Sequence, residues 1–150
     1  MWDGGPTLRG MLSASCTYGL RAMAFLASRD PGNYVPIREI SERLQISFHF
    51  LSKILHRLAA EGLVETYRGP NGGARLSRAP RAISVHDIVV AIDGPGLFKD
   101  CVLGLPGCGE AAPCPMHAAW AGQRAELEAS FQSQHLEQMA SGYVDLGERL

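Results

Sequence analysis

The sequence predicts a mainly α-helical fold with a small β-hairpin, organised as a winged helix-turn-helix domain plus a long C-terminal dimerisation helix. Two short helical patterns flank a tight turn, a glycine-rich hairpin pattern follows them, and a cysteine-rich loop precedes a long helical stretch. A chain of 150 residues suits one domain with an extension. We expect an N-terminal extension at 1–10 and the winged helix-turn-helix domain at 11–84. A linker helix, the cysteine-rich loop and the dimerisation helix are expected at 85–150.

The first helix is expected from about Ser15 to Ser28, because apolar residues recur there at helical spacing. Its apolar face holds Leu20, Met23, Ala24 and Ala27. The Asp-Pro-Gly-Asn stretch at 30–33 then ends it, since proline and glycine cannot continue the helical turn.

Two further helices form the predicted helix-turn-helix. The first follows Pro36, and its apolar positions are Ile37, Ile40 and Leu44. Gln45 and Ile46 form the turn, and the Ser47 hydroxyl caps the next helix. That helix carries an apolar face at Leu51, Ile54, Leu55 and Leu58. Gly62 provides a helix-ending glycine.

A β-hairpin is expected directly after these helices. Alternating segments at 63–67 and 74–76 flank the sequence Arg-Gly-Pro-Asn-Gly-Gly at 68–73, in which Asn71 and Gly72 are expected to supply positive φ angles. A helix-turn-helix followed by a basic hairpin is typical of a winged helix. A helical bundle with an unrelated hairpin is the alternative, but it does not require a tip so rich in glycine and so poor in apolar residues.

The charge distribution favours a local surface for nucleic acid. Between Arg38 and Arg81 there are eight Lys or Arg residues and four Glu, although the whole chain has a net charge of −1. A basic middle between acidic ends is the electrostatic footprint of a DNA-facing surface, although solvated helix faces also produce it. No apolar stretch is long enough for a membrane span or a signal peptide, so we expect a cytoplasmic protein.

The C-terminal half is expected to hold two more helices around the cysteine loop. One runs from about Val85 to Ile92, and a final helix runs from Pro115 to about Met139, on the order of 37 Å. An apolar stripe along the final helix comprises Met116, Trp120, Leu127, Phe131 and Met139. A helix of this length overshoots so small a domain, which predicts a homodimer; packing onto its own domain is the alternative.

The loop at 94–117 carries the pattern that indicates a metal. Cys101, Cys108 and Cys114 fall within fourteen residues, and His117 follows three positions later. Thiolates grouped so tightly suit a metal ion or an iron–sulfur cluster, and the spacing alone leaves the metal open. A disulfide framework is disfavoured because only the distant Cys16 could complete the pairs. A reduced loop with incidental cysteines is the remaining alternative.

Several stretches together carry a family resemblance. They are 18–23, 35–42, 46–51, 62–64, 68–73 and 113–117, with Trp120. From Leu12 to about Met139 the chain resembles the bacterial transcriptional regulators of the IscR, NsrR and CymR type. The resemblance implies a homodimeric winged-helix protein that binds double-stranded operator DNA, with an affinity tuned by a cluster or by its absence.

The resemblance also implies a ligand set for a 2Fe–2S or 4Fe–4S cluster. It comprises Cys101, Cys108, Cys114 and, as in the IscR type, His117. Two departures concern the ligands. Six residues, rather than five, separate the first two cysteines, and Thr17 stands where the NsrR type has a carboxylate supplied by the partner. Cys16 from the partner chain is therefore the alternative fourth ligand.

The predicted DNA contacts lie on the recognition helix and on the wing. The outward side of the helix carries His49, Phe50, Ser52, Lys53, His56 and Arg57. Phe50 either meets a thymine methyl group or closes the core. The resemblance places Arg68 in the minor groove, with Asn71 near the DNA backbone. Arg75 is expected to make a generic phosphate contact.

These observations favour a DNA-binding regulator controlled by an iron–sulfur cluster that senses redox state, iron, oxygen or nitric oxide. The alternative is a regulator of the same fold with structural zinc or no metal, controlled by a protein partner or by thiol oxidation. An enzyme is disfavoured, since no Ser/His/Asp set, phosphate loop or suggestive carboxylate pair is present.

Overall fold

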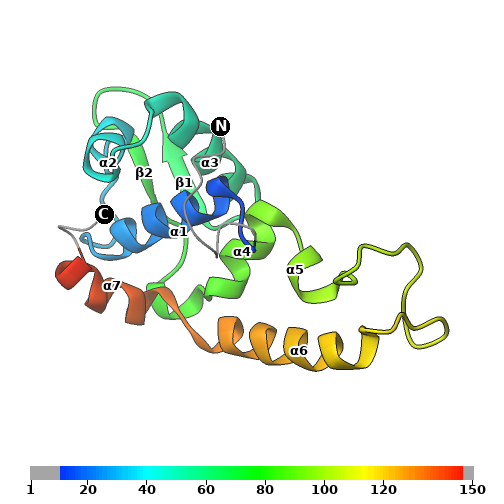
Figure 1. Ribbon diagram of the computed structural model, residues 1–150. Helices are drawn as coiled ribbons and strands as arrows, with labels where there is room; N and C mark the ends of the chain where they lie inside the picture. Colours follow the sequence, from blue (N-terminus) through cyan, green and yellow to red (C-terminus); the bar gives the residue numbers. More distant parts are fainter. Residues whose placement is uncertain (1–10, 147–150) are drawn as a thin grey trace.

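The computed structural model of the chain describes residues 11–146, so the expected extension at 1–10 lies outside the described residues. Its elements, in chain order, are α1 (Ala14–Ala27), α2 (Ile37–Leu44), α3 (Phe48–Ala60), β1 (Val64–Tyr67), β2 (Gly73–Leu76), η1 (Pro80–Ala82), α4 (Val85–Asp93), α5 (Gly96–Lys99), α6 (His117–Ser133) and α7 (Leu136–Leu146). Figure 1 shows a helical body with one hairpin, and α6 extending from it toward the cysteine loop. This arrangement confirms the predicted fold class.

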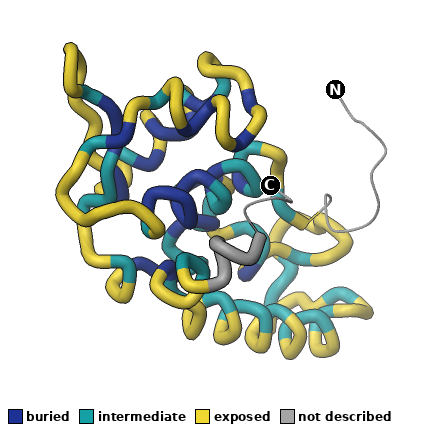
Figure 2. The backbone as a smooth tube through the Cα atoms, turned by 90° about the vertical axis from the view of Figure 1, so that its left-hand side faces the viewer, coloured by how far each residue is buried: buried dark blue, intermediate teal, exposed yellow. Residues whose placement is uncertain are grey.

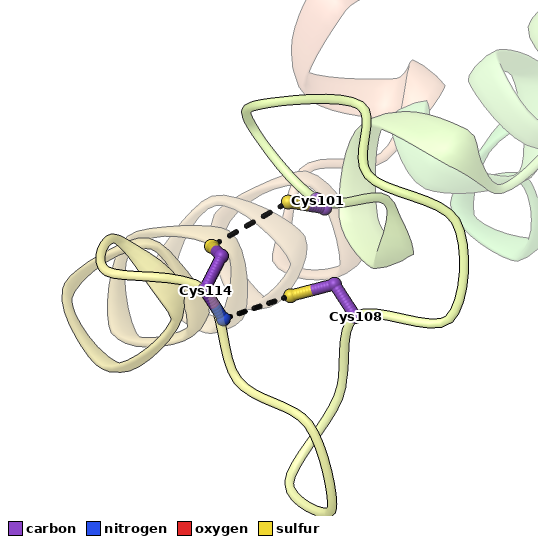
Figure 3. A group of neighbouring side chains, drawn as sticks. All are labelled: Cys101, Cys108 and Cys114. Atoms are coloured by element: carbon purple, nitrogen blue, oxygen red, sulfur yellow. Dashed lines mark hydrogen bonds between the residues drawn. The ribbon is translucent and has the colours of Figure 1, made fainter.

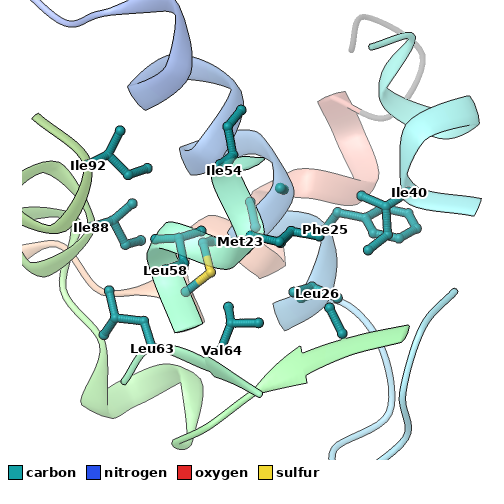
Figure 4. Packing of buried hydrophobic residues seen from close by; sticks show 14 of the residues in the cluster. Met23, Phe25, Leu26, Ile40, Ile54, Leu58, Leu63, Val64, Ile88 and Ile92 are labelled. Atoms are coloured by element: carbon teal, nitrogen blue, oxygen red, sulfur yellow. The ribbon is translucent and has the colours of Figure 1, made fainter. Parts of the chain in front are cut away.

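Helix α1 lies at the centre of the core and packs on α3, α4 and α7. Its Ser13 cap accepts a hydrogen bond from the Cys16 amide at 3.0 Å, and Met23 and Phe25 are buried among the aliphatic residues of Figure 4. At Gly19 the α1 backbone lies against the Ile92 side chain of α4, because a Cβ there would lie 2.2 Å from Cδ1 of Ile92. Glycine at this position lets α1 and α4 approach each other.

The helix-turn-helix follows the sequence prediction. Gln45 makes the turn in the left-handed conformation, with φ of 56°, and the Ser41 hydroxyl donates to the Ile46 carbonyl at 2.6 Å. The Ser47 side chain accepts from the Phe50 amide at 3.1 Å, which confirms the predicted cap of α3. The four apolar residues predicted to face inward are buried: Leu51, Ile54, Leu55 and Leu58.

The hairpin is an antiparallel pair in which Val64 faces Leu76 and Tyr67 faces Gly73. The prediction that Asn71 and Gly72 supply the positive φ angles is wrong. Gly69 and Gly73 supply them, with φ of 115° and 151°. Gly73 is required for a second reason, because a Cβ there would lie 2.0 Å from the carbonyl oxygen of Val35. The start of β2 is thereby held against the chain that precedes α2, where Val35 and Ala74 exchange two backbone hydrogen bonds.

The single helix predicted from Pro115 to Met139 is also wrong, because the chain is extended at Gln134 between α6 and α7. The Gln134 carbonyl accepts from the Val85 amide at 2.8 Å, and the Leu136 amide donates to the Ile83 carbonyl at 2.9 Å. These backbone bonds, together with the burial of Leu136, replace the helical bonds that are lost. Helix α7 then continues beyond α6 and packs along α1.

This break changes the role of the predicted apolar stripe. Leu127, Phe131 and Met139 pack against the core of their own domain, and the Phe131 ring meets that of Phe98 edge-on at 5.7 Å. None of the 17 residues of α6 is buried, and Figure 2 shows exposed residues recurring along it. The exposed face is composed largely of small side chains: Ala118, Gly122, Ala125, Ala129 and Ser133. Among the helices of residues 11–146, none is long and apolar enough to cross a membrane.

Candidate metal centre and nucleic-acid surface

The three cysteines of the loop converge on one point. Cys101 follows α5, Cys114 precedes α6, and Cys108 lies in the loop between them. Their Sγ atoms all lie within 4.8 Å of one another, and those of Cys101 and Cys114 are 3.6 Å apart. Figure 3 shows the thiols directed toward a common space. The loop therefore presents three half-buried sulfur donors together.

His117 offers a possible fourth donor beside Cys108. It is the first residue of α6, and its Nδ1 lies 3.6 Å from Sγ of Cys108. The Cys114 amide donates to the same sulfur at 3.4 Å. Cys108 therefore contacts both Cys114 and His117 at the C-terminal end of the loop. The three cysteines that the sequence singled out are brought together in space, and His117 lies beside one of them, Cys108.

The electrostatics distinguish the thiols. Hydrogen bonds from the Leu105 backbone, and secondarily from Leu103, lower the pKa of Cys101 to about 7. Partial removal from water raises the pKa of Cys114. Helix α6 begins three residues later, at His117, so Cys114 does not lie in the first turn, where the helix dipole would favour a thiolate.

Helix α6 holds the chain on which Cys101 sits. The Asp100 carbonyl accepts from Trp120 Nε1 at 3.0 Å and from Arg124 at 2.8 Å, and Arg124 also reaches the Lys99 carbonyl. Arg124 was missed in the sequence, where an arginine on the polar side of a helix carries no distinguishing signal. This contact joins the start of the cysteine loop to α6.

Cys16, the alternative ligand, lies in the core. It is fully buried on α1, and burial, with the nearby Asp93 carboxylate, raises its pKa to about 12. A buried neutral thiol is a poor metal ligand, because metals bind the thiolate. The neighbouring Thr17 is half-buried.

A second contact links α6 to the winged-helix body. His86 Nε2 on α4 lies 3.0 Å from Glu128 Oε1 on α6, and the His86 ring packs on Phe98 at 4.8 Å. Phe98 in turn meets Phe131. Polar and aromatic contacts thus connect α6 with α4, which packs directly on α1 and α3.

The predicted DNA residues border a groove of about 570 Å³ between α3 and the wing. The groove brings together His49, Ser52, Lys53, His56 and Arg68. It also includes Phe48, which we did not single out from the sequence. Arg57 and Asn71 are exposed but lie outside this groove.

Two predicted DNA residues have contacts within the protein. Phe50 is half-buried and meets the Tyr18 ring edge-on at 5.8 Å, so of its two alternatives the structure favours closing the core. Arg75 pairs with Glu65 at 2.8 Å and donates to the Gly32 carbonyl at 2.8 Å. Its guanidinium also lies 4.4 Å from the centre of the Tyr34 ring, so it anchors the wing.

Comparison with known proteins finds relatives both by sequence and by fold. The chain is 34% identical over 109 residues to the HTH-type transcriptional regulator IscR of Escherichia coli, covering 73% of this chain and 67% of IscR. Its fold is similar to CymR, the global cysteine regulator of B. subtilis, with a TM-score of 0.74, 28% identity, and coverage of 87% and 95%. T. potens IscR gives a TM-score of 0.69 at 28% identity, with coverage of 87% and 85%.

The model of the Rrf2 family, whose description is iron-dependent transcriptional regulator, matches residues 12–142. This span covers the helix-turn-helix, the wing, the cysteine loop and α6. The relatives are transcriptional regulators rather than enzymes. The chain belongs to the Rrf2 family of transcriptional regulators.

Proposed function

We propose that this chain is a homodimeric regulator whose affinity for operator DNA is controlled by an iron–sulfur cluster held at the cysteine loop. The observation that carries the proposal is the convergence of three Sγ atoms within 4.8 Å, with His117 Nδ1 beside them. These donors occupy a loop that α6 ties to the DNA-binding body. A regulator of transcription works in the cytoplasm, where its thiols stay reduced.

The donor set fits such a group. Cys101, Cys108 and Cys114 would hold it as thiolates, and His117 would supply the fourth donor. Three thiolates and an imidazole are soft and borderline ligands, which suit iron–sulfur clusters and zinc. When bound, the cluster would supply a redox-active, ligand-exchanging centre that small oxidants can alter. A neutral imidazole among thiolates is the donor most readily lost.

A specific observation favours a second candidate. The distance of 3.6 Å between the Sγ atoms of Cys101 and Cys114 is close to the sulfur–sulfur distance in a tetrahedral zinc site. That distance is about 3.8 Å for Zn–S bonds of about 2.3 Å. The same pair, Cys101 and Cys114, is also close enough for a disulfide to form after modest movement. The second candidate is therefore a regulator with structural zinc, or one controlled by oxidation of these two thiols.

The contacts of α6 support a route from the loop to the DNA-binding surface. Changes at Cys101 reach α6 through Trp120 and Arg124, which hold the preceding carbonyls. Helix α6 reaches α4 through Glu128 and His86. Because α4 packs on α1 and α3, two loop states that differ in ligation would bias the position of α3.

In this proposal α3 enters the major groove and the wing flanks it. His49, Ser52 and Lys53 face the groove beside Arg68, as base or phosphate contacts require. Arg57 and Asn71 would touch the DNA backbone outside this groove. The exposed small-residue face of α6 provides the dimer seam, because small side chains let two helices approach closely.

The test is purification under anaerobic conditions with measurement of visible absorbance, iron, sulfide and zinc. If a cluster is bound, the protein should be coloured and contain iron and sulfide. A colourless protein that contains zinc supports the second candidate.

We expect Cys108→Ala to lose the cluster, to remain a folded dimer, and to shift operator affinity by several-fold. His117→Ala is the matched variant, which should retain some cluster with an altered spectrum. If Cys108→Ala binds as much iron and sulfide as the parent, the loop is not the cluster site.

A further inference from the structure

The ring of Phe48 is unusually placed for a phenylalanine. It belongs to the first residue of α3, and 48% of the residue is exposed. Two positions later, Phe50 turns inward and packs on Tyr18. Leaving an aromatic ring in water forgoes the stabilisation that burial would provide. The exposed ring is therefore available to a partner outside the folded chain.

One neighbouring side chain contacts the ring, and two hydrogen bonds fix the helical turn that carries it. The Arg38 guanidinium of α2 lies 5.7 Å from the ring centre, within range of a cation–π contact. The Phe48 carbonyl accepts from the Ser52 hydroxyl at 2.7 Å, and the Ser47 side chain caps the same turn. An ordered ring loses little conformational entropy when it contacts a ligand.

The surroundings of Phe48 identify the chemistry of that ligand. The ring lines the groove between α3 and the wing with His49, Lys53 and Arg68, which are suited to an anionic partner. Helical side chains tilt toward the N-terminus, the end of a recognition helix that meets base edges. In the major groove the apolar group on those edges is the 5-methyl group of thymine.

We propose that Phe48 reads a thymine in each operator half-site by packing its ring against the 5-methyl group in the major groove. Arg38 is the positioning residue that holds the ring in place. The assignment rests on the proposed docking of α3 in the major groove, and adds to it the base and the atom that are read.

The experiment uses the full-length protein and a duplex that it selects from a random-sequence pool. Each thymine of this duplex is replaced singly by deoxyuridine, which removes only the methyl group. Losing one buried methyl contact weakens binding by about fourfold. For the parent protein, we expect this loss of affinity at one thymine in each half-site. Phe48→Ala should bind the thymine and deoxyuridine duplexes equally at that position. Phe48→Leu should still bind the deoxyuridine duplex more weakly.

Arg68→Ala is the matched control in the same groove. It should weaken binding to the thymine and uracil duplexes by the same factor, so that the ratio between them stays parental. Arg38→Met should reduce the preference for the thymine duplex over the uracil duplex but should not remove it. Two results would overturn the inference: a parental protein indifferent to every substitution, or a Phe48→Ala protein that keeps the parental penalty. If the parent selects no duplex at all, the proposed DNA docking fails first and takes the inference with it.

Discussion

At the residue scale, the chemistry of each cysteine is set by its surroundings rather than by its position in the sequence. Cys16 lies within α1, buried beside a carboxylate, whereas Cys101 lies in the loop after α5 and receives backbone hydrogen bonds. The pKa values of the two differ accordingly, about 12 against about 7. Only the second is suited to act as a thiolate at neutral pH.

This difference predicts a pattern of alkylation in the reduced, metal-free protein. Because the lowered pKa of Cys101 is about 7, its reaction with iodoacetamide should accelerate as the pH rises from 6 to 8 and then level off. Cys16 should stay unmodified across that range, since its thiol is buried and its pKa is raised to about 12. Peptide mass spectrometry after timed quenching measures both. Comparable rates at Cys16 and Cys101 would show that α1 does not shield its thiol as described.

At the element scale, the break between α6 and α7 determines which surfaces the C-terminal half offers. Leu136 anchors the break, with 0% of its surface exposed and its amide bound to the Ile83 carbonyl. The result is that α7 covers α1 and the apolar residues of α6 serve their own domain. Helix α6 keeps only its small-residue face for a partner.

Truncating this anchor should destabilise the fold. Leu136→Ala removes a fully buried side chain and leaves a cavity, which costs roughly 2–5 kcal/mol of unfolding free energy. Leu103→Ala, at a residue that is 53% exposed, is the control and should change stability by less than about 0.5 kcal/mol. Urea denaturation followed by circular dichroism measures the two. Equal, small effects would mean that α7 does not dock through Leu136.

At the scale of the whole molecule, the candidate metal centre and the groove beside α3 lie on different parts of one connected body. The cysteine loop projects at the N-terminal end of α6, whereas α3 and the wing lie on the helical body (Figure 1). The contacts of α6 with α5 and α4 join the two regions. A dimer formed through α6 would therefore bring two loops and two recognition helices under one two-fold symmetry.

A charge placed on the small-residue face should separate the dimer. A Cβ at Gly122 would meet nothing within 4 Å in the protomer, so Gly122→Glu should fold normally while burying like charges in the seam. Gln123→Glu, at the edge of the exposed face, adds the same charge and should stay dimeric. Sedimentation analysis distinguishes the two species. A dimeric Gly122→Glu protein would place the interface on another surface.

The sequence by itself determined the local elements and the set of candidate metal ligands. The helix-turn-helix follows from apolar spacing and the Ser47 cap, because these features act within a few residues. The four candidate ligands could be recognised because they crowd into one short, glycine-rich loop, and the structure brings the three cysteines among them together. The wing could be placed as well, although not the glycines that carry its positive φ angles.

Only the tertiary structure decided how these elements meet. No proline or glycine marks the end of α6; the break arises from backbone bonds to residues about fifty positions earlier in the chain, at Ile83 and Val85. The same kind of distant contact turned Phe50 inward toward Tyr18 and Arg75 toward Glu65 and Gly32, and left Phe48 exposed. Such outcomes depend on which surfaces are buried when distant parts of the chain pack together. The helical spacing of apolar residues does not indicate which surfaces these are.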